Sequence, residues 1–379
     1  MIQRSIDSIL TPALLIDGPT LNANIDRMNR QVEGLGVSLR PHLKTVKNAE
    51  LARRMMDGHA GGATVSTLAE ADYFHAAGIT DLTYAVGIAP SRLAPVAERR
   101  KAGLSLTLIL DHPDTARALV EYARAHSIDF RVLIELDADG DRAGLRPDEH
   151  ALLDTANILR EGGQGPAGVL VHAGGSYACR SQNALTALAE RERLVAVEAA
   201  NRLRNEGHPI EVVSVGSTPT ALFAERLDGV TEVRAGVYSC MDLVMVGLGV
   251  CSLDAIAISV LTEVIGHRRA SGELLVDAGW MALSRDRGTA SHDLDQGYGL
   301  VRDARGGPID QAMLVRATNQ EHGIVASRSG ESLPLDHFPI GTRLRILPNH
   351  ACATAAQFDH FDLIENDGLT RLARCYGWG

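Results

Sequence analysis

Residues 104–126 read LSLTLILDHPDTARALVEYARAH, and their pattern indicates the class of fold. Its first part, 104–111, is an apolar run rich in Leu that ends at Asp111, which predicts a buried strand. Its second part, 114–126, has apolar residues at helical spacing, which predicts an amphipathic helix. A strand followed directly by a helix is the repeating unit of a parallel α/β sheet.

The same strand-then-helix unit recurs on both sides of this stretch. Strands are predicted at 38–45, 63–67, 81–87, 104–111, 130–137, 168–173, 212–217 and 232–238. Helical patterns lie between them, and several end near a Gly. Eight such units favour a closed (β/α)8 TIM-like barrel over 12–247, with its chemistry at the C-terminal ends of the strands.

The pattern changes after Leu248. Strand-like runs such as GELLVDAGW and TRLRILPNHACATA now follow one another through turns rich in Gly, Asp and Pro, without intervening helices. We therefore expect a second, β-rich domain over 248–379.

Composition excludes several classes of protein. The 379 residues include 37 basic and 47 acidic side chains, a net charge of −10, so the chain offers no basic field for nucleic acid or an anionic membrane. No apolar run approaches the roughly 20 residues of a spanning helix, and the first residues lack a secretory signal. The five cysteines are scattered and odd in number, so we expect reduced thiols and a cytoplasmic protein.

Lys44, in the segment RPHLKT, is the first candidate for chemistry. A lysine at the mouth of a barrel strand can be desolvated and lose its proton, as a Schiff-base lysine must. The alternative is a solvated lysine at a strand end.

Three Gly-bearing turns and one arginine form the second group. HAGGSYA (172–178), VGSTPT (215–220) and RAGVYS (234–239) follow predicted strands, where backbone amides and hydroxyls can hold a phosphate; each could equally be a tight turn. Ser217 or Thr218 is suited to cap the next helix, with Pro219 in its first turn. Arg142, in LDADGDRAG, could serve the site or form a surface salt bridge.

His350 and Cys352, in LPNHACAT, form the third group. If this segment is a strand, residues two apart share a face, so imidazole and thiolate could bind one metal ion, zinc first, with open coordination positions. Packing is the alternative for such a pair. Asp277 and His322 are further candidates, with a turn aspartate and a satisfied core histidine as alternatives.

Ten motifs in fixed order resemble one family. The chain from about 11 to 356 is similar to the group of D-serine dehydratases and D-threonine aldolases, which are fold-type III pyridoxal phosphate enzymes related to alanine racemase. Its runs SVGSTPT, DAGWMA, SRDRGTA and NQEHGI resemble most closely the dehydratases of D-threo-3-hydroxyaspartate. The ten motifs are TPALLID, RPHLKT, VSTLAEA, LDADGDRAG, HAGGS, VGSTPT, TEVRAGVY, VDAGW, NQEHG and LPNHACAT.

The resemblance implies a role for each candidate. Lys44 would bond covalently to pyridoxal 5'-phosphate and act as the catalytic base, His172 would pack against the ring, and Arg142 would face the pyridine nitrogen. The phosphate would be held by Ser217, Thr218, Gly236 and Tyr238, with Tyr177 as a helper. His350 and Cys352 would bind a divalent metal: Zn, or Mn or Mg. The resemblance also implies a homodimer and a β domain to which residues 1–11 contribute.

The implied function is a dehydratase of D-3-hydroxy amino acids, D-threo-3-hydroxyaspartate or D-serine, that yields a 2-oxo acid and ammonia by β-elimination. The alternative is an aldolase that cleaves Cα–Cβ; in aldolases of this group we expect HCD where this chain has HAC, which favours the dehydratase. A cofactor-storage protein would not need the β domain, and a racemase would need a second acid/base for which no motif stands out. Arg285, Arg287 and His292 could bind the second carboxylate of hydroxyaspartate, or belong to a solvated loop.

Overall fold

The computed structural model describes residues 5–377 except 60, 141, 310 and 367. The described chain divides into two compact units, one comprising Arg27–Gly236 and the other Val237–Tyr376 together with the segment that ends at Asp26. Positions 1–4 and 378–379 of the predicted β domain lie outside the described residues.

The first unit is built on an eight-stranded parallel sheet of order β2-β9-β8-β7-β6-β5-β4-β3. The amide of Leu43 donates to the carbonyl of Thr64 (2.9 Å), and the amide of Thr64 donates to that of Pro41 (2.8 Å), so the two end strands also meet and the barrel closes. The strands are β2 (Ser38–Leu39), β3 (Ala63–Val65), β4 (Asp81–Gly87), β5 (Ser105–Leu110), β6 (Arg131–Leu136), β7 (Gly168–Val171), β8 (Val212–Val215) and β9 (Glu232–Val233).

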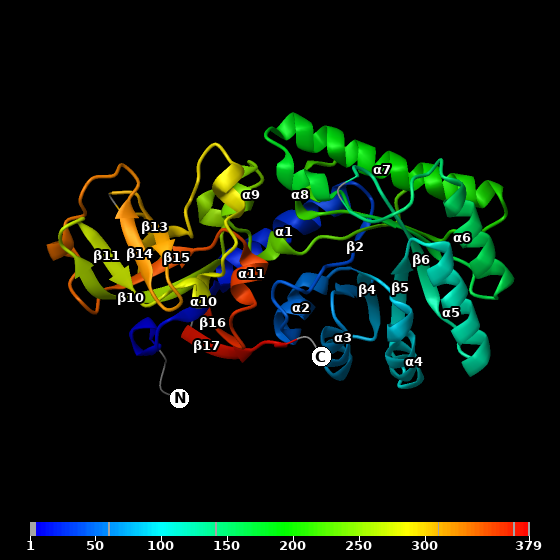
Figure 1. Cartoon of the computed structure of the whole chain (residues 1–379), viewed down its shortest axis with the longest axis horizontal. Coiled ribbons are helices and arrows are strands. Elements are labelled where there is room, and N and C mark those ends of the chain that lie inside the picture. Colours follow the sequence, from blue (N-terminus) through cyan, green and yellow to red (C-terminus); the bar gives the residue numbers. More distant parts are fainter. Residues whose placement is uncertain (1–4, 60, 141, 310, 367, 378–379) are drawn as a thin grey trace. The chain divides into compact units, whose positions relative to one another are not determined.

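Helices cover the outside of this barrel, and Figure 1 shows α4, α5 and α6 running along strands β4, β5 and β6. Helix α5 illustrates the local cause: His112 caps it by accepting from the amide of Asp114, and Pro113 begins it with a preset φ. The helices of this unit are α2 (Ala49–Met56), α3 (Leu68–Ala76), α4 (Leu93–Lys101), α5 (Pro113–His126), α6 (His150–Glu161), α7 (Gln182–Asn205) and α8 (Thr218–Phe223). Helix α1 (Gly18–Gly34) begins in the second unit and ends in this one.

The second unit contains a nine-stranded sheet of order β11-β14-β13-β12-β15-β10-β1-β16-β17. Strand β11 also pairs with β10, so the first six strands close into a small antiparallel barrel. The strands are β1 (Ala13–Asp17), β10 (Ile258–Arg268), β11 (Glu273–Val276), β12 (Leu300–Asp303), β13 (Met313–Thr318), β14 (Gly323–Ser327), β15 (Arg343–Leu347), β16 (His360–Glu365) and β17 (Gly368–Ala373). Three short helices accompany them: α9 (Leu243–Gly247), α10 (Trp280–Leu283) and α11 (Ala351–Ala355).

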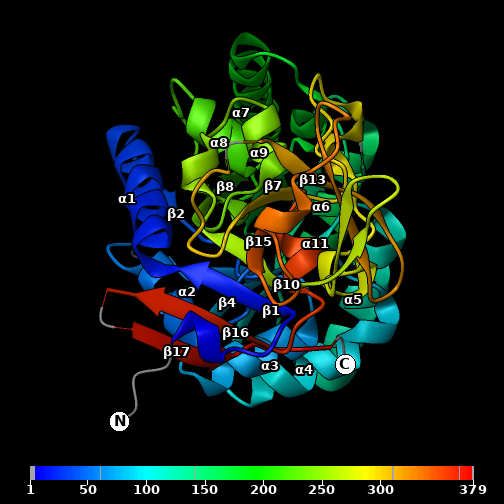
Figure 2. The ribbon, with the colours of Figure 1, turned by 90° about the vertical axis from the view of Figure 1, so that its left-hand side faces the viewer.

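Strand β1 ties the N-terminal segment into this sheet. It pairs antiparallel with β10 and parallel with β16, as Figure 2 shows, and Ile9, Ala13, Leu15 and Leu261 pack together in one buried cluster. The part of the N-terminal segment that belongs to the sheet therefore extends to Asp17, beyond residue 11.

The predicted fold class, a (β/α)8 barrel plus a β domain, is confirmed. Each predicted barrel strand exists, although those at 38–45 and 232–238 are much shorter than predicted and pair as strands only over Ser38–Leu39 and Glu232–Val233. Among the described residues, none of the helices is both long and apolar enough to cross a bilayer.

Candidate functional site

Lys44 lies in a turn beyond the end of β2, where the chain leaves the barrel wall. The amides of Arg40 and His42 still bond to the carbonyls of Val233 and Ala235, but residues 43–46 form a turn, so Lys44 is not on a strand.

Lys47 closes this turn with a left-handed φ of 45°. Its amide bonds to the carbonyl of Leu43, and its ammonium pairs with Glu70 at 3.0 Å. The turn therefore holds Lys44, which is half-buried, in a defined place.

Positive charges converge beside this lysine. The pKa of His42 is well below its ordinary value because of burial and because Lys44 and Arg234 repel a proton there. The charges of Arg142, Arg234 and Lys44 likewise disfavour the protonated form of His172. Two neutral imidazoles surrounded by cations make a setting that attracts an anion.

His172 follows β7 and has one defined tautomer. Its Nε2 lies 3.1 Å from the Arg142 guanidinium, which can only donate, so Nε2 is the acceptor. Its Nδ1 therefore carries the hydrogen and donates to the carbonyl of Gly216 at 3.0 Å. Burial lowers the pKa of His172 to about 3, so the ring stays neutral. For Arg142 the alternative was a surface salt bridge. Its side chain is exposed, as that alternative requires, but its hydrogen-bond partner is His172 and not a carboxylate.

The turn after β8 contains a position that only glycine can occupy, and it is followed directly by a helix cap. Gly216 has a φ of +130°, and an added Cβ would lie 2.3 Å from the carbonyl oxygen of Arg234. Ser217 caps α8 in a reciprocal capping box with Thr220, which confirms one of the two predicted caps, and Thr218 is the first helical residue. The Ser217 hydroxyl also lies 3.2 Å from that of Ser176, so the β7 and β8 loops meet here.

The remaining predicted cofactor residues differ in exposure. Tyr177 lies in a 3-10 turn and is 39% exposed. At Gly236 an added Cβ would lie 2.8 Å from the carbonyl oxygen of His42, so the backbone passes close to the lysine turn. Tyr238 belongs to the second unit, is fully buried, and has a pKa raised by burial, so its hydroxyl keeps its proton.

The residues of the barrel unit fit pyridoxal phosphate. A lysine in a rigid turn suits the aldehyde, hydroxyls and tight glycine turns suit the phosphate, and the convergent cations suit its negative charge.

His350 and Cys352 come together, but not on a strand. Strand β15 ends at Leu347, His350 is the N-cap residue of α11, and Cys352 lies in its first turn, so the predicted strand geometry is wrong. The Nδ1 of His350 is 2.6 Å from an Asp286 carboxylate oxygen, and its ring also hydrogen-bonds the Cys352 sulfur. Burial lowers the pKa of His350, but Asp286 and Cys352 outweigh it and raise the pKa to about 11. A cation is therefore favoured at this place.

Asp242 anchors the backbone of this group. Its buried carboxylate accepts from the amide of Ala351 and from that of Met245, both at 2.9 Å, so it fixes the residue between the imidazole and the thiol. No group of three or more His, Cys, Asp or Glu side chains with metal-binding geometry occurs within 5–377 as described. An imidazole and a thiol fit a zinc-type ion held by two protein ligands, with positions left for water or substrate.

The other candidates from the sequence have structural roles or stay outside these groups. Asp277 is a structural aspartate, because it accepts from the hydroxyls of Thr11 (2.5 Å) and Thr262 (2.6 Å). His322 is exposed. Arg287 pairs with Asp295 and lies over the ring of Tyr298, whereas the exposed Arg285 lies over Trp280 at 4.2 Å.

Sequence reasoning missed four polar residues that the structure places at these groups: His42, Glu192, Asp242 and Asp286. His42 lies in the motif RPHLKT and Asp286 in the run SRDRGTA, but neither segment reveals the partner of its polar residue. Glu192 and Asp242 carried no signal, because a single carboxylate in a helical pattern or a turn is ordinarily solvated.

Two family models match consecutive parts of the chain, and curated relatives match it along its length. Residues 16–243 match the family described as "Alanine racemase, N-terminal domain", and residues 257–364 match "Putative serine dehydratase domain". The D-threo-3-hydroxyaspartate dehydratase of Delftia sp. (strain HT23) is 49% identical over 100% of both chains, and the D-serine dehydratase of Dictyostelium discoideum is 30% identical over 96% of this chain and 95% of that one.

Solved structures show the same relationship. The structure of the Delftia enzyme has a TM-score of 0.97 at 48% identity and covers 99% of this chain and all of that chain; a cysteine-to-alanine mutant of the dehydratase has been solved "in the metal-free form". A D-threonine aldolase from Filomicrobium marinum, at 24% identity and a TM-score of 0.82 over 97% and 96% of the chains, shares the fold. This chain therefore belongs to the family that unites D-threo-3-hydroxyaspartate dehydratase with the D-serine dehydratases, built on an alanine racemase-type barrel.

Proposed function

We propose that this chain is a dehydratase of D-3-hydroxy amino acids, with D-threo-3-hydroxyaspartate as its preferred substrate, that depends on pyridoxal phosphate and a divalent metal. The observation that carries the proposal is the His350–Cys352 pair backed by Asp286. The barrel unit separately supplies the Lys44 turn and the cations Arg234 and Arg142. The 49% identity to the Delftia dehydratase over the whole chain supports the choice of substrate. The proposal includes a homodimer and a cytoplasmic location.

The cofactor and the metal would contribute different chemistry to the reaction. The bound cofactor would withdraw electrons from the substrate α-carbon, and the bound metal would polarise the 3-hydroxyl as a Lewis acid. The Lys44 amine would take the α-proton, and the hydrogen-bonded turn fixes the backbone from which this side chain extends. Loss of the hydroxyl would leave an enamine, which hydrolyses to a 2-oxo acid and ammonia.

His172 would pack against the cofactor ring, and Arg142 would face its pyridine nitrogen. The neutral Nδ1–H tautomer of His172 presents a flat apolar face, and its Nε2 keeps the guanidinium of Arg142 in place at 3.1 Å. A guanidinium can only donate hydrogen bonds, so a ring nitrogen that faced Arg142 would accept from it and stay unprotonated, which limits side reactions.

His350 and Cys352 would hold the metal. With Nδ1 of His350 engaged by Asp286, Nε2 is the nitrogen left for a metal, and a thiolate is the second ligand. Imidazole with thiolate favours zinc over magnesium or manganese.

Product analysis by mass spectrometry tests the proposal. The purified holoenzyme is incubated with D-threo-3-hydroxyaspartate, D-serine and D-threonine, each with and without a chelator. Oxaloacetate with ammonia from the first substrate, lost on chelation, is the expected result. Glycine with an aldehyde would show an aldolase instead. The Lys44→Ala variant should lose at least ~100-fold in turnover, as expected for removal of a general base, whereas Lys101→Ala on the surface should not.

A further inference from the structure

Helix α7 carries a fully buried carboxylate on the face that packs against the barrel. Leu185, Ala189, Ala196, Ala199 and Leu203 make up most of this face, and Glu192, which is 1% exposed, lies among them. Two residues earlier, Glu190 is partly exposed and pairs with Arg193 and Arg226, as carboxylates on outer helices ordinarily do. Burial of a carboxylate costs several kcal/mol unless the group is hydrogen-bonded, so Glu192 needs a specific reason for its place.

The contacts of Glu192 supply that reason. One carboxylate oxygen, Oε1, accepts from the amide of Ala173 at 2.9 Å and from the amide of Gly216 at 3.1 Å. Ala173 directly follows His172, and the carbonyl of Gly216 accepts from Nδ1 of the same histidine. The hydrogen bonds thus form a closed ring that runs from Glu192 through Ala173 and His172 to Gly216 and back.

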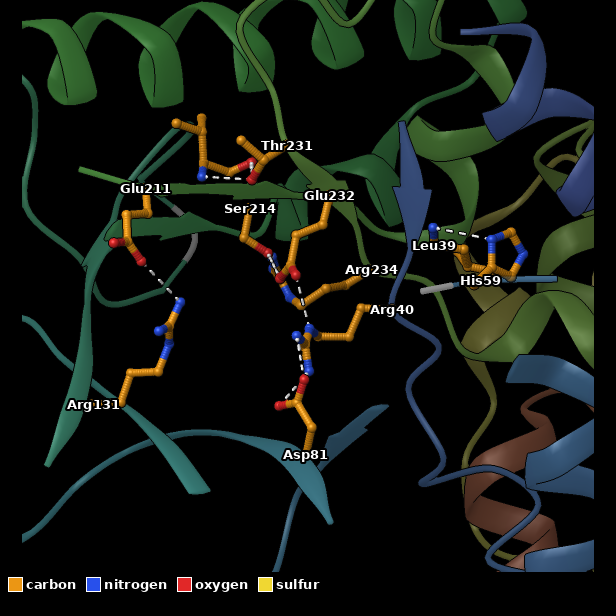
Figure 3. A network of polar contacts seen from close by, with 11 residues as sticks. Leu39, Arg40, His59, Asp81, Arg131, Glu211, Ser214, Thr231, Glu232 and Arg234 are labelled. Atoms are coloured by element: carbon orange, nitrogen blue, oxygen red, sulfur yellow. Dashed lines mark hydrogen bonds and ion pairs between the residues drawn. The ribbon is translucent and has the colours of Figure 1, made fainter. Parts of the chain in front are cut away.

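Arg234 holds the same loop from inside the barrel. Its guanidinium donates to the carbonyl of Val171 at 2.7 Å and to the hydroxyl of Ser214 at 2.6 Å, and Ser214 in turn donates to Glu232. Figure 3 shows this chain of contacts continuing from Glu232 through Arg40 to Asp81. His172 is therefore fixed on both sides, at Val171 by Arg234 and at Ala173 by Glu192.

We propose that Glu192 is a positioning residue that fixes the tautomer of His172 and the spacing of the β7 and β8 loops, and thereby prepares the cofactor site. A single oxygen shared by the two amides keeps Ala173 and Gly216 at a set distance. The carbonyl of Gly216 then points at Nδ1 of His172, and Nε2 is left to accept from Arg142. The link to the cofactor rests on the proposed function; the effect on His172 does not.

Two substitutions of Glu192 separate the effect of side-chain length from that of charge, and a third substitution serves as their control. Glu192→Gln keeps an oxygen at the same reach and removes the charge, whereas Glu192→Asp keeps the charge and shortens the side chain by one methylene. Glu190→Gln, on the exposed face of the same helix, is the matched control. Folding of each variant is checked by thermal unfolding before the other measurements.

Two readouts are made on each variant, the first on the holoenzyme and the second on protein from which the cofactor has been removed. The ¹⁵N shifts of histidine-labelled protein report the tautomer of His172, assigned by loss of its signals in His172→Gln. For the second readout, pyridoxal phosphate is first removed from the protein and then added back in increasing amounts. The absorbance of the bound cofactor at equilibrium gives the dissociation constant. We expect Glu192→Asp to lose the single-tautomer pattern and to bind pyridoxal phosphate at least ~10-fold more weakly, while Glu192→Gln and Glu190→Gln stay within about 3-fold of the parent.

Other outcomes would overturn the proposal. If Glu192→Asp keeps both the ¹⁵N pattern of His172 and the cofactor affinity, Glu192 does not position the loop. If Glu192→Gln is as impaired as Glu192→Asp, an oxygen at the right distance is not sufficient and the negative charge is needed as well, which contradicts positioning by the oxygen alone. If affinity falls with the His172 signals unchanged, the coupling through His172 is wrong. Failure of the dehydratase assay would bear on the proposed function alone, because the ¹⁵N pattern does not depend on the substrate.

Discussion

The Nδ1 nitrogen of His350 lies 2.6 Å from a carboxylate oxygen of Asp286, 64 residues away in the chain. The hydrogen bond from the imidazole lowers the pKa of Asp286, so the acceptor is a carboxylate. A carboxylate at Nδ1 directs Nε2 of the ring to a metal and makes the ring a better ligand.

Removal of this carboxylate should therefore weaken metal binding. We expect Asp286→Ala to lower the affinity for Zn²⁺ by roughly 10–100-fold, because the imidazole loses its fixed orientation. Competition with a chromogenic chelator measures this affinity directly. Asp295→Asn, in the same loop but paired with Arg287, is the control and should bind zinc as the parent does. Equal affinities in Asp286→Ala and the parent would show that Asp286 does not orient the metal ligand.

His172 should make the folded state sensitive to acid. Its folded pKa of about 3 lies below the ordinary value of 6.5, so between these values the unfolded chain binds more protons and stability rises with pH. Between pH 7 and pH 5 this one group should remove up to about 2 kcal/mol from the free energy of unfolding. The shift of His42 has the same direction and the same main cause, burial.

Urea unfolding of the cofactor-free protein at pH 7 and pH 5 measures this effect. His172→Gln should lose less stability between the two pH values than the parent does, since its side chain does not titrate. The same substitution at the exposed His322 should leave the pH dependence as it is in the parent. An unchanged pH dependence in His172→Gln would mean that His172 is not held neutral.

The barrel and the β domain could be predicted because both are recorded in local pattern. Runs such as LSLTLILD read as strands whatever their partners are, and β5 spans Ser105–Leu110 as the pattern predicts. The strand at 38–45 was predicted too long, because closure of the barrel at His42 is made by single bonds to β3 and not by a longer ladder.

Polar partners across long sequence separations could not be predicted. Glu192 looks like any carboxylate of an amphipathic helix, and its role depends on Ala173 and Gly216, which only the packing of α7 brings to it. The pairing of His350 with Cys352 was predicted for the wrong local reason, since the segment turns into a helix after Leu347. An imidazole and a thiol suit a metal ion because of their chemistry, which the sequence shows. Their relative position depends on the start of α11, which the sequence pattern did not predict.

Gly216 should be intolerant of a side chain. A Cβ at this position would lie 2.3 Å from the backbone oxygen of Arg234, and its φ of +130° is strained for any other residue. We expect Gly216→Ala to lower the free energy of unfolding by about 1–3 kcal/mol and to weaken pyridoxal phosphate binding, because the carbonyl that holds His172 must move. Gly165→Ala, where the added atom meets nothing within 4 Å, is the control. Urea unfolding and cofactor titration compare the two variants, and equal behaviour would contradict a tight backbone approach at Gly216.

Arg285 should distinguish hydroxyaspartate from D-serine. It directly precedes Asp286, is exposed, and forms no ion pair with any residue that the structure describes, whereas Arg287 is already paired with Asp295. The ring of Trp280 at 4.2 Å supports its guanidinium, and a guanidinium is suited to bind a second carboxylate. A hydrogen-bonded charge is worth about 1.5–3 kcal/mol, so Arg285→Gln should raise KM for D-threo-3-hydroxyaspartate by roughly 10–100-fold. D-serine lacks that carboxylate, and its KM should stay unchanged in the same variant. Steady-state kinetics with both substrates measure the difference; an equal rise for both would mean that Arg285 shapes the loop instead of reading the substrate.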